Sequence, residues 1–283
     1  MKKILLLAVQ VIYAFLLILL ISGLPILFQN MKPDFAGYFE YIQQVVLKLI
    51  YFNNDTFWGM SPIFPTVVER TADSLILLIL AILIGFVLSF FASSAAVLFM
   101  KDKGVWLKRL IFGAEAIPDI FIITVLQAVV IMIYKKTDVL IVRVASLGDD
   151  KSYFLPLVCL VIPASVFLMK IMIHAFEEEY GKRYVELARS IGTAPLRLLW
   201  LHIVRNTVHR FMIASKTLIW SLLASLLIIE YVFNYPGVLS FLLTYRSPEV
   251  FLVSVSLLFL PFFLLYQSYF MFAPSLIKGE KDG

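Results

Sequence analysis

The chain has 283 residues, of which 61% are hydrophobic and only 15% are charged, and it carries a formal net charge of +5. Soluble domains average about 45–50% apolar and about 25% charged residues, so this composition excludes an ordinary soluble globular protein. The single cysteine, Cys159, excludes a disulfide framework within the chain, and basic residues spread over short connections between apolar runs favour membrane topology control over nucleic-acid binding.

Six apolar runs follow one another along the chain, each near the length of about 20 residues that an α-helix needs to cross a bilayer. Backbone groups in lipid must bond internally, and the runs are too long for barrel strands. We therefore expect an all-α, polytopic membrane protein with six transmembrane helices. The first run is too long for a signal peptide, so we expect it to be retained. The expected helices are 4–28, 74–100, 110–134, 155–173, 211–233 and 251–272.

Two connections between these helices are long. Residues 29–73 contain an apolar stretch, 38–52, that we expect to form a short interfacial helix, and residues 174–210 are rich in charge. If the N-terminus is inside, the inner segments hold 16 of the 24 lysines and arginines and the outer segments hold 8. The positive-inside rule then predicts that both termini and 174–210 face the cytoplasm, with 29–73 outside. We expect the whole chain, 1–283, to form a single transmembrane domain.

The inner connection contains two short helical patterns separated by a glycine. Residues 184–191 favour a helix, and Gly192 is expected to end it. Thr193 can cap the next helix, with Pro195 in its first turn. Two short helices at a sharp turn can transmit force from a soluble partner, although an inert amphipathic loop fits the pattern as well. Helical spacing predicts one apolar stripe on the second helix, made of Leu196, Leu199, Trp200 and Ile203.

Polar residues within the expected spans are candidates for a translocation path. Glu115 and Asp119 lie four residues apart and would share one face of the third helix. Ionisable groups at membrane depth are costly and suggest a function, here a path for a cation or a substrate amine. The alternative is a partly hydrated inner turn, or pairing with Lys170 or Lys216. Gln127 is a further candidate, with an interhelical hydrogen bond as its alternative.

The sequence carries no enzyme signature. It lacks the His-Glu-x-x-His, Gly-x-Ser-x-Gly and Gly-x-x-x-x-Gly-Lys-Ser/Thr patterns, so we expect neither catalysis nor ATP binding by a phosphate loop. His202 and His209 make only a weak metal case, and we expect no metal site. Two alternatives come from other classes. One is a secondary transporter, which would need ion-cycling charges and broken helices in symmetric halves. The other is an intramembrane enzyme or assembly factor.

The inner connection also carries a spaced motif. Glu186-Leu187-Ala188 stands three residues before Gly192, as in the Glu-Ala-Ala loop of ABC importer permeases. The wider pattern resembles the oligopeptide/dipeptide/nickel permease family, which reads Tyr-Val-x-x-Ala-Arg-x-x-Gly, then nine residues, then His-x-x-Arg-Asn. The residues that match this pattern in register are Tyr184, Ala188, Arg189, Gly192, His202, Arg205 and Asn206.

A second motif after the expected fifth helix is similar to the same family. It is the Glu-x-x-Phe-Asn-x-Pro-Gly segment, and its matching residues are Glu230, Asn234, Pro236 and Gly237. The chain departs from the family at four places, so it resembles a divergent member. These are Lys32-Pro33-Asp34 after the first helix, Leu239 at an expected glycine, Ala273-Pro274-Ser275 near the end, and the stretch before the inner loop, where the expected basic residues are Lys170 and His174 and the acidic run Glu177-Glu178-Glu179 follows.

The resemblance implies a type I (MetI-like) permease fold and a first-permease, "B"-type subunit of an ABC importer in the bacterial cell membrane. In this family the inner loop is a coupling helix that sits in a groove of a cytoplasmic ATPase, here residues 184–192, with Arg205 and Asn206 anchoring the next helix. The implied partners are a second homologous permease, two ATPase subunits that bind ATP and Mg, and an extracytoplasmic substrate-binding protein. The chain would form half of a path for a small solute such as a peptide or metal complex.

Overall fold

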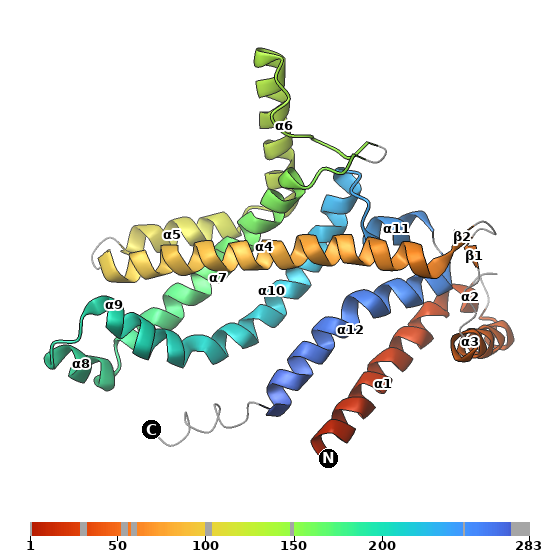
Figure 1. Ribbon diagram of the computed structural model, residues 1–283, viewed down its shortest axis with the longest axis horizontal. Coiled ribbons are helices and arrows are strands. Elements are labelled where there is room, and N and C mark those ends of the chain that lie inside the picture. Colours follow the sequence, from red (N-terminus) through yellow and green to blue (C-terminus); the bar gives the residue numbers. More distant parts are fainter. Residues whose placement is uncertain are drawn as a thin grey trace. The chain divides into compact units, whose positions relative to one another are not determined.

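The computed structural model describes residues 2–28, 33–51, 56–57, 61–99, 104–147, 150–245 and 247–272. Most of these residues are helical (Figure 1), and their only strands are a short antiparallel pair, β1 (Thr56–Phe57) and β2 (Ser61–Pro62). Six of the described helices are long and apolar enough to cross a membrane. The predicted all-α class with six transmembrane helices is therefore confirmed.

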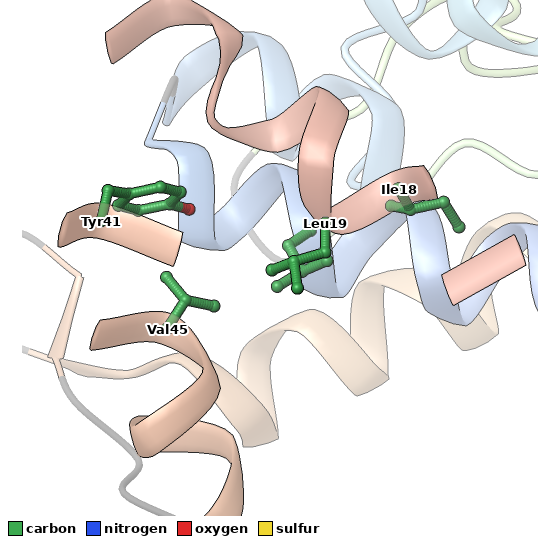
Figure 2. Packing of buried hydrophobic residues seen from close by; sticks show 5 residues of the cluster. Ile18, Leu19, Tyr41 and Val45 are labelled. Carbon is green, nitrogen blue, oxygen red and sulfur yellow. The ribbon is translucent and has the colours of Figure 1, made fainter. Parts of the chain in front are cut away.

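The chain forms two compact units, one made of residues 1–75 and 236–283 and the other of residues 76–235. In the first unit α1 packs along α12, and α3 joins them through a buried cluster of Ile18, Leu19, Tyr41, Val45 and Leu252. Figure 2 shows Tyr41 and Val45 of α3 pointing toward Leu19 of α1. The helices of this unit are α1 (Lys2–Ser22), α2 (Leu24–Leu27), α3 (Phe35–Ile50), α11 (Val238–Thr244) and α12 (Pro248–Phe272), together with the start of α4 (Ile63–Phe99).

The second unit is built around α7 and α10, which pack against each other. α4 approaches α7 closely, because a Cβ atom on Gly85 would lie 3.0 Å from that of Ala164. The Ser89 hydroxyl donates to the Ser165 carbonyl at 2.7 Å, so small and hydroxyl residues hold this helix pair together. Besides most of α4, the unit contains α5 (Gly104–Glu115), α6 (Asp119–Thr137), α7 (Phe154–Tyr180), α8 (Arg183–Ser190), α9 (Pro195–Leu198), the π-helix η1 (Leu199–Val204) and α10 (Arg205–Val232).

The predicted third span, 110–134, is wrong as one helix. α5 ends at Glu115 and α6 begins at Asp119, so only α6 is long and apolar enough to cross a membrane. Pro118 stands between them in an extended conformation, with φ −61° and ψ 140°. Proline disfavours the helical region for the residue before it, which explains the break. Glu115 and Asp119 therefore do not share a helix face.

Several other predicted bounds mark the apolar part of a helix and miss its polar ends. α4 begins at Ile63, eleven residues before the predicted 74, which shortens the expected loop 29–73. α7 continues beyond the predicted 173 to Tyr180, and α10 begins at Arg205, before the predicted 211. Polar residues such as Glu69 and Glu177 are good helix formers, so each helix continues beyond the apolar run that predicted it. The helix expected at 38–52 is α3, and residue 52 lies outside the described residues.

Candidate functional site

The 184–206 segment forms a corner between α7 and α10, made of α8, Gly192, α9 and η1 (Figure 1). Gly192 ends α8 with a φ of +81°, in the left-handed region. Its N–H donates to the carbonyl of Arg189 at 2.9 Å, and the N–H of Thr193 donates to that of Ala188 at 3.1 Å. This pair of bonds is the Schellman motif, so the predicted glycine turn is present.

Two local predictions for the second helix are wrong. The residue before α9 is Ala194, and no side chain caps the helix, so Thr193 does not fill that role, although Pro195 does begin the helix. The expected stripe is split, because Leu199 and Ile203 are buried whereas Leu196 and Trp200 are exposed. The π-helical turn η1 changes the helical period, which the α-helical spacing of the sequence did not anticipate.

The α8 helix has one buried face and one exposed apolar tip. Val185 and Ala188 are buried. The tip, which consists of Leu187, Ile191 and Leu196, is 66%, 76% and 60% exposed, respectively. These residues lie in α8, in α9 and in the turn between them, outside the long helices α7 and α10. Three exposed apolar side chains around one turn make this tip a candidate interaction surface.

A buried carboxylate holds α8 in place from inside the corner. Glu179, near the end of α7, is only 2% exposed. It accepts a hydrogen bond from the Lys182 ammonium at 2.6 Å and one from the Tyr184 hydroxyl at 2.5 Å. The Asn206 amide of α10 donates to that same hydroxyl at 3.0 Å. Glu179 and Tyr184 thus join α7, α8 and α10 in one network, which we call the Glu179 network.

The Tyr184 phenol faces into this network and away from the exposed tip. Burial, together with the hydrogen bond to Glu179, raises the pKa of Tyr184 to about 12. The phenol therefore stays protonated at neutral pH and donates to the carboxylate. The His202 ring lies 6.3 Å from the Tyr184 ring, measured between centroids. Three of the residues expected at the coupling surface, Tyr184, His202 and Asn206, are thus brought together.

The other motif residues lie around this network. The Arg189 guanidinium sits over the Tyr180 ring at 3.6 Å from its centroid, a cation–π contact that fixes α8 to the end of α7. Glu186 and Arg205 are exposed. The neighbouring Glu178 pairs with Arg210 of α10, whose second nitrogen donates at 2.7 Å.

From the sequence, Glu179 is named only as part of a departure from the family pattern and is given no role. The signal was available, since Glu177, Glu178 and Glu179 form an acidic run at the C-terminal end of a helix. The helix dipole disfavours negative charge at that end. An acidic run there requires compensating partners nearby, and Lys182 and Arg210 provide them.

The candidate path residues each have a polar partner within the second unit. The Glu115 carboxylate pairs with Lys170 of α7 at 2.6 Å, one of the alternatives that the sequence left open. Asp119 accepts a hydrogen bond from the Ser225 hydroxyl of α10. The Gln127 amide donates to the Val144 carbonyl at 3.4 Å.

The second motif begins at the other end of α10. Asn234 adopts the left-handed conformation with φ 47°, and the N–H of Tyr235 donates to the Glu230 carbonyl at 2.9 Å, which gives a second Schellman turn. The Asn234 amide donates to the Ser146 carbonyl at 3.1 Å, and Glu230 is fully buried. After Pro236, Gly237 precedes α11, and the N–H of Val238, the first residue of that helix, donates to the Ser74 hydroxyl at 2.8 Å.

Comparison with known proteins places this geometry in a transport family. Residues 85–277 match the family described as binding-protein-dependent transport system inner membrane component, and this range contains both motifs. The metal-staphylopine import system permease protein CntB from two Staphylococcus aureus strains, Mu50 and NCTC 8325, is 24% identical over 162 residues, 55% of this chain. The match spans about half the length, 50%, of those relatives. The chain belongs to the family of inner membrane components of binding-protein-dependent transport systems.

Proposed function

We propose that this protein is the transmembrane permease subunit of an ATP-binding-cassette importer in a bacterial cell membrane. It would form half of the translocation path and pair with a second homologous permease, two ATPase subunits and an extracytoplasmic substrate-binding protein. ATP and Mg would be bound by the ATPases. Family membership supports the class, and because the family match runs from residue 85 to residue 277 through both compact units, we treat 1–283 as one permease domain.

The observation that carries the coupling proposal is the exposed apolar tip on a firmly held corner. Leu187, Ile191 and Leu196 offer an apolar knob to a partner, while the Glu179 network fixes the knob to two long helices. A partner that moves the knob must therefore also move α7 and α10. We propose that the tip seats in a groove of the ATPase, which requires the 184–206 segment and both termini to lie in the cytoplasm.

The proposed substrate class rests on the relatives and on the polar residues of the proposed path. CntB is the permease of a metal-staphylopine import system, so a small solute such as a metal complex, or alternatively a peptide, is our proposed substrate class. The path would pass Glu115, Asp119 and Gln127. Their polar partners allow charged and amide groups to remain between apolar helices, because each group has a hydrogen bond or an opposite charge.

Thiol accessibility tests the path. In a Cys159→Ala background, Asp119→Cys is expected to react with a water-soluble methanethiosulfonate reagent in the membrane-embedded complex. Ile123→Cys, one turn further along α6 and buried, is the matched control and should not react. An Asp119→Cys thiol that is as protected as that of Ile123→Cys would contradict the proposed path.

A charge on the tip tests the coupling role. The double variant Leu187→Asp with Ile191→Asp leaves the buried face of α8 unchanged, so we expect normal membrane insertion and yield. The matched control is Leu140→Asp, an exposed leucine in the connection between α6 and α7. Tagged protein is purified from its own host in mild detergent, and co-purifying chains are identified by mass spectrometry.

The expected result is that wild type and Leu140→Asp retain ATPase chains and a second permease, whereas the tip variant retains the permease and loses the ATPases. Retention of ATPases by the tip variant at the wild-type level would overturn the docking role. If the wild-type protein is recovered without any ATPase, the importer proposal itself fails.

A further inference from the structure

The α3 helix contacts only one end of each of two membrane-spanning helices. The N–H of Asp34, just before α3, donates to the Leu27 carbonyl at 2.9 Å, and the Tyr38 hydroxyl donates to the Leu20 carbonyl at 3.0 Å. The Tyr38 ring lies so close to Gly23 that a Cβ atom there would be 2.7 Å away. All of these contacts fall in the last turns of the candidate span Ile4–Leu27.

The other end of α3 reaches the start of α12. Lys48, in the last turn of α3, pairs with Glu249 at 3.3 Å, and Glu249 is in the first turn of α12. The end of α1 and the start of α12 therefore lie on the same side of the membrane. In Figure 1, α3 is seen nearly along its axis, while α1 and α12 run across the view. α3 thus lies crosswise over one end of the helix pair.

The depth of α3 follows from the length of the first span. Its 24 residues extend about 36 Å at about 1.5 Å per residue, which exceeds the hydrocarbon thickness of about 30 Å. The last turns of this span, which α3 contacts, consequently reach the boundary between acyl chains and headgroups. A helix that crosses them there lies in the plane of the membrane surface.

The surface of α3 is divided into three faces. Tyr41 and Val45 are buried against α1 and α12. The polar face carries Glu40 and Gln44, which are both exposed. Between these two lies an exposed apolar stripe, whose members fall within about 60° of one another at about 100° per residue. This stripe consists of Phe35, Phe39, Val46 and Ile50.

We propose that the Phe35–Phe39–Val46–Ile50 stripe inserts into the lipid monolayer and makes α3 an in-plane membrane anchor. An amphipathic helix at this depth buries its apolar face at the headgroup–acyl boundary and keeps its polar face in water. Aromatic side chains suit this boundary, and the adjacent turns of α1 and α2 also expose Leu20 and Leu24, respectively. The anchor would brace the joined ends of α1 and α12. The inference rests on these two helices crossing the membrane, and it is independent of ATPase coupling.

Spin labels on the two faces test the proposal in lipid nanodiscs. In the Cys159→Ala background, labels are attached to Phe39→Cys on the stripe and to Gln44→Cys on the polar face, and their collision rates with oxygen and a water-soluble nickel chelate are measured. We expect the Phe39 label to collide more with oxygen and the Gln44 label to collide more with the nickel chelate. Phe35→Cys is a second stripe position in case Phe39→Cys does not fold.

Two results would overturn the proposal. Preference of both stripe labels for the nickel chelate would show that the stripe faces water. Protection of both stripe labels from both reagents would show that a protein surface covers it. Because the measurement needs only the permease in a bilayer, loss of ATPase docking in the tip variant leaves the expected result unchanged, so the two proposals fail separately.

Discussion

Two turns of the same backbone type, one at the end of α8 and one at the end of α10, have opposite surroundings. Gly192, in the corner before α10, has φ +81° and open space where a Cβ would lie. Asn234, just after α10, has φ 47°, and its amide is bonded to the Ser146 carbonyl. The first turn lies next to an exposed apolar tip, and the second lies between the buried side chains of Phe233 and Tyr235.

This difference shows what each turn is built to contact. Gly192 has no side chain, and the apolar side chains of Leu187, Ile191 and Leu196 near it are exposed. At Asn234 the turn residue itself bonds to another connection of the same chain, which is further fixed by the Ser146 N–H donating to the Phe233 carbonyl at 2.8 Å. The turn at Asn234 is therefore fixed within the chain, whereas the turn at Gly192 leaves the proposed docking tip exposed.

The largest effect should come from breaking the support of the first region. Glu179→Leu leaves the Tyr184 hydroxyl inside the corner without its acceptor, and a donor left unpaired there costs about 1–3 kcal/mol. The Lys182 side chain is 41% exposed, so water can replace its bond to Glu179 at little cost. We expect a clear drop in melting temperature in detergent and loss of ATPase retention. The control is Glu177→Leu, which removes an exposed carboxylate two residues earlier in the same acidic run, so a smaller loss of stability is expected there. If the two variants have the same melting temperature and the same ATPase retention, the Glu179 network has no special part in supporting the tip.

Substitution of Gly192 should have the next largest effect on stability. A non-glycine residue in the left-handed region costs about 1–2 kcal/mol, so Gly192→Ala should lower the melting temperature although no atom blocks its Cβ. Gly192→Asn should cost less, because asparagine tolerates this conformation. If alanine and asparagine at 192 give the same melting temperature, backbone conformation is not what selects glycine there.

Asn234 allows the reverse substitution. Asn234→Gly keeps the turn conformation and removes only the bond to Ser146, a loss of about 0.5–1.5 kcal/mol. Asn234→Ala removes the bond and also strains the turn, so the melting temperatures should fall in the order wild type, glycine, alanine. Neither variant should release the ATPases. Release would mean that the second region, too, takes part in docking.

The smallest effect concerns pH. The folded pKa of Tyr184 is raised from 10.0 to about 12, so folding favours the protonated phenol. Its contribution to stability is present below pH 10 and is lost as the pH rises toward 12. Tyr184→Phe should consequently lose stability relative to wild type at pH 8, and this difference should narrow at pH 11. A difference in melting temperature that stays constant from pH 8 to pH 11 would contradict the role of the phenol proton.

Sequence reasoning succeeded where a property is local. The spacing from Tyr184 to Asn206 predicted a helix, a glycine turn and a second helix, and α8, Gly192 and α9 have that order. It failed where a local pattern was overridden, as at Pro118, which divides the third apolar run, and at η1, which shifts the faces of the second helix. It also gave Glu179 no role, because the acidic run indicates a need for cationic partners but does not show which of its three carboxylates is buried or what it bonds to.

The sequence by itself determined the class of the protein, six apolar spans, and the two motifs that place it in a transport family. Hydropathy and turn preferences depend on residues that are close together in the sequence, so they can be recognised before the tertiary structure is known. Only the tertiary structure decided which groups meet. It joined Glu179 to Tyr184 and Asn206, paired Glu115 with Lys170, and laid α3 across the ends of α1 and α12. Such pairings depend on which helix turns come together in space, and the order of residues along one helix does not specify that.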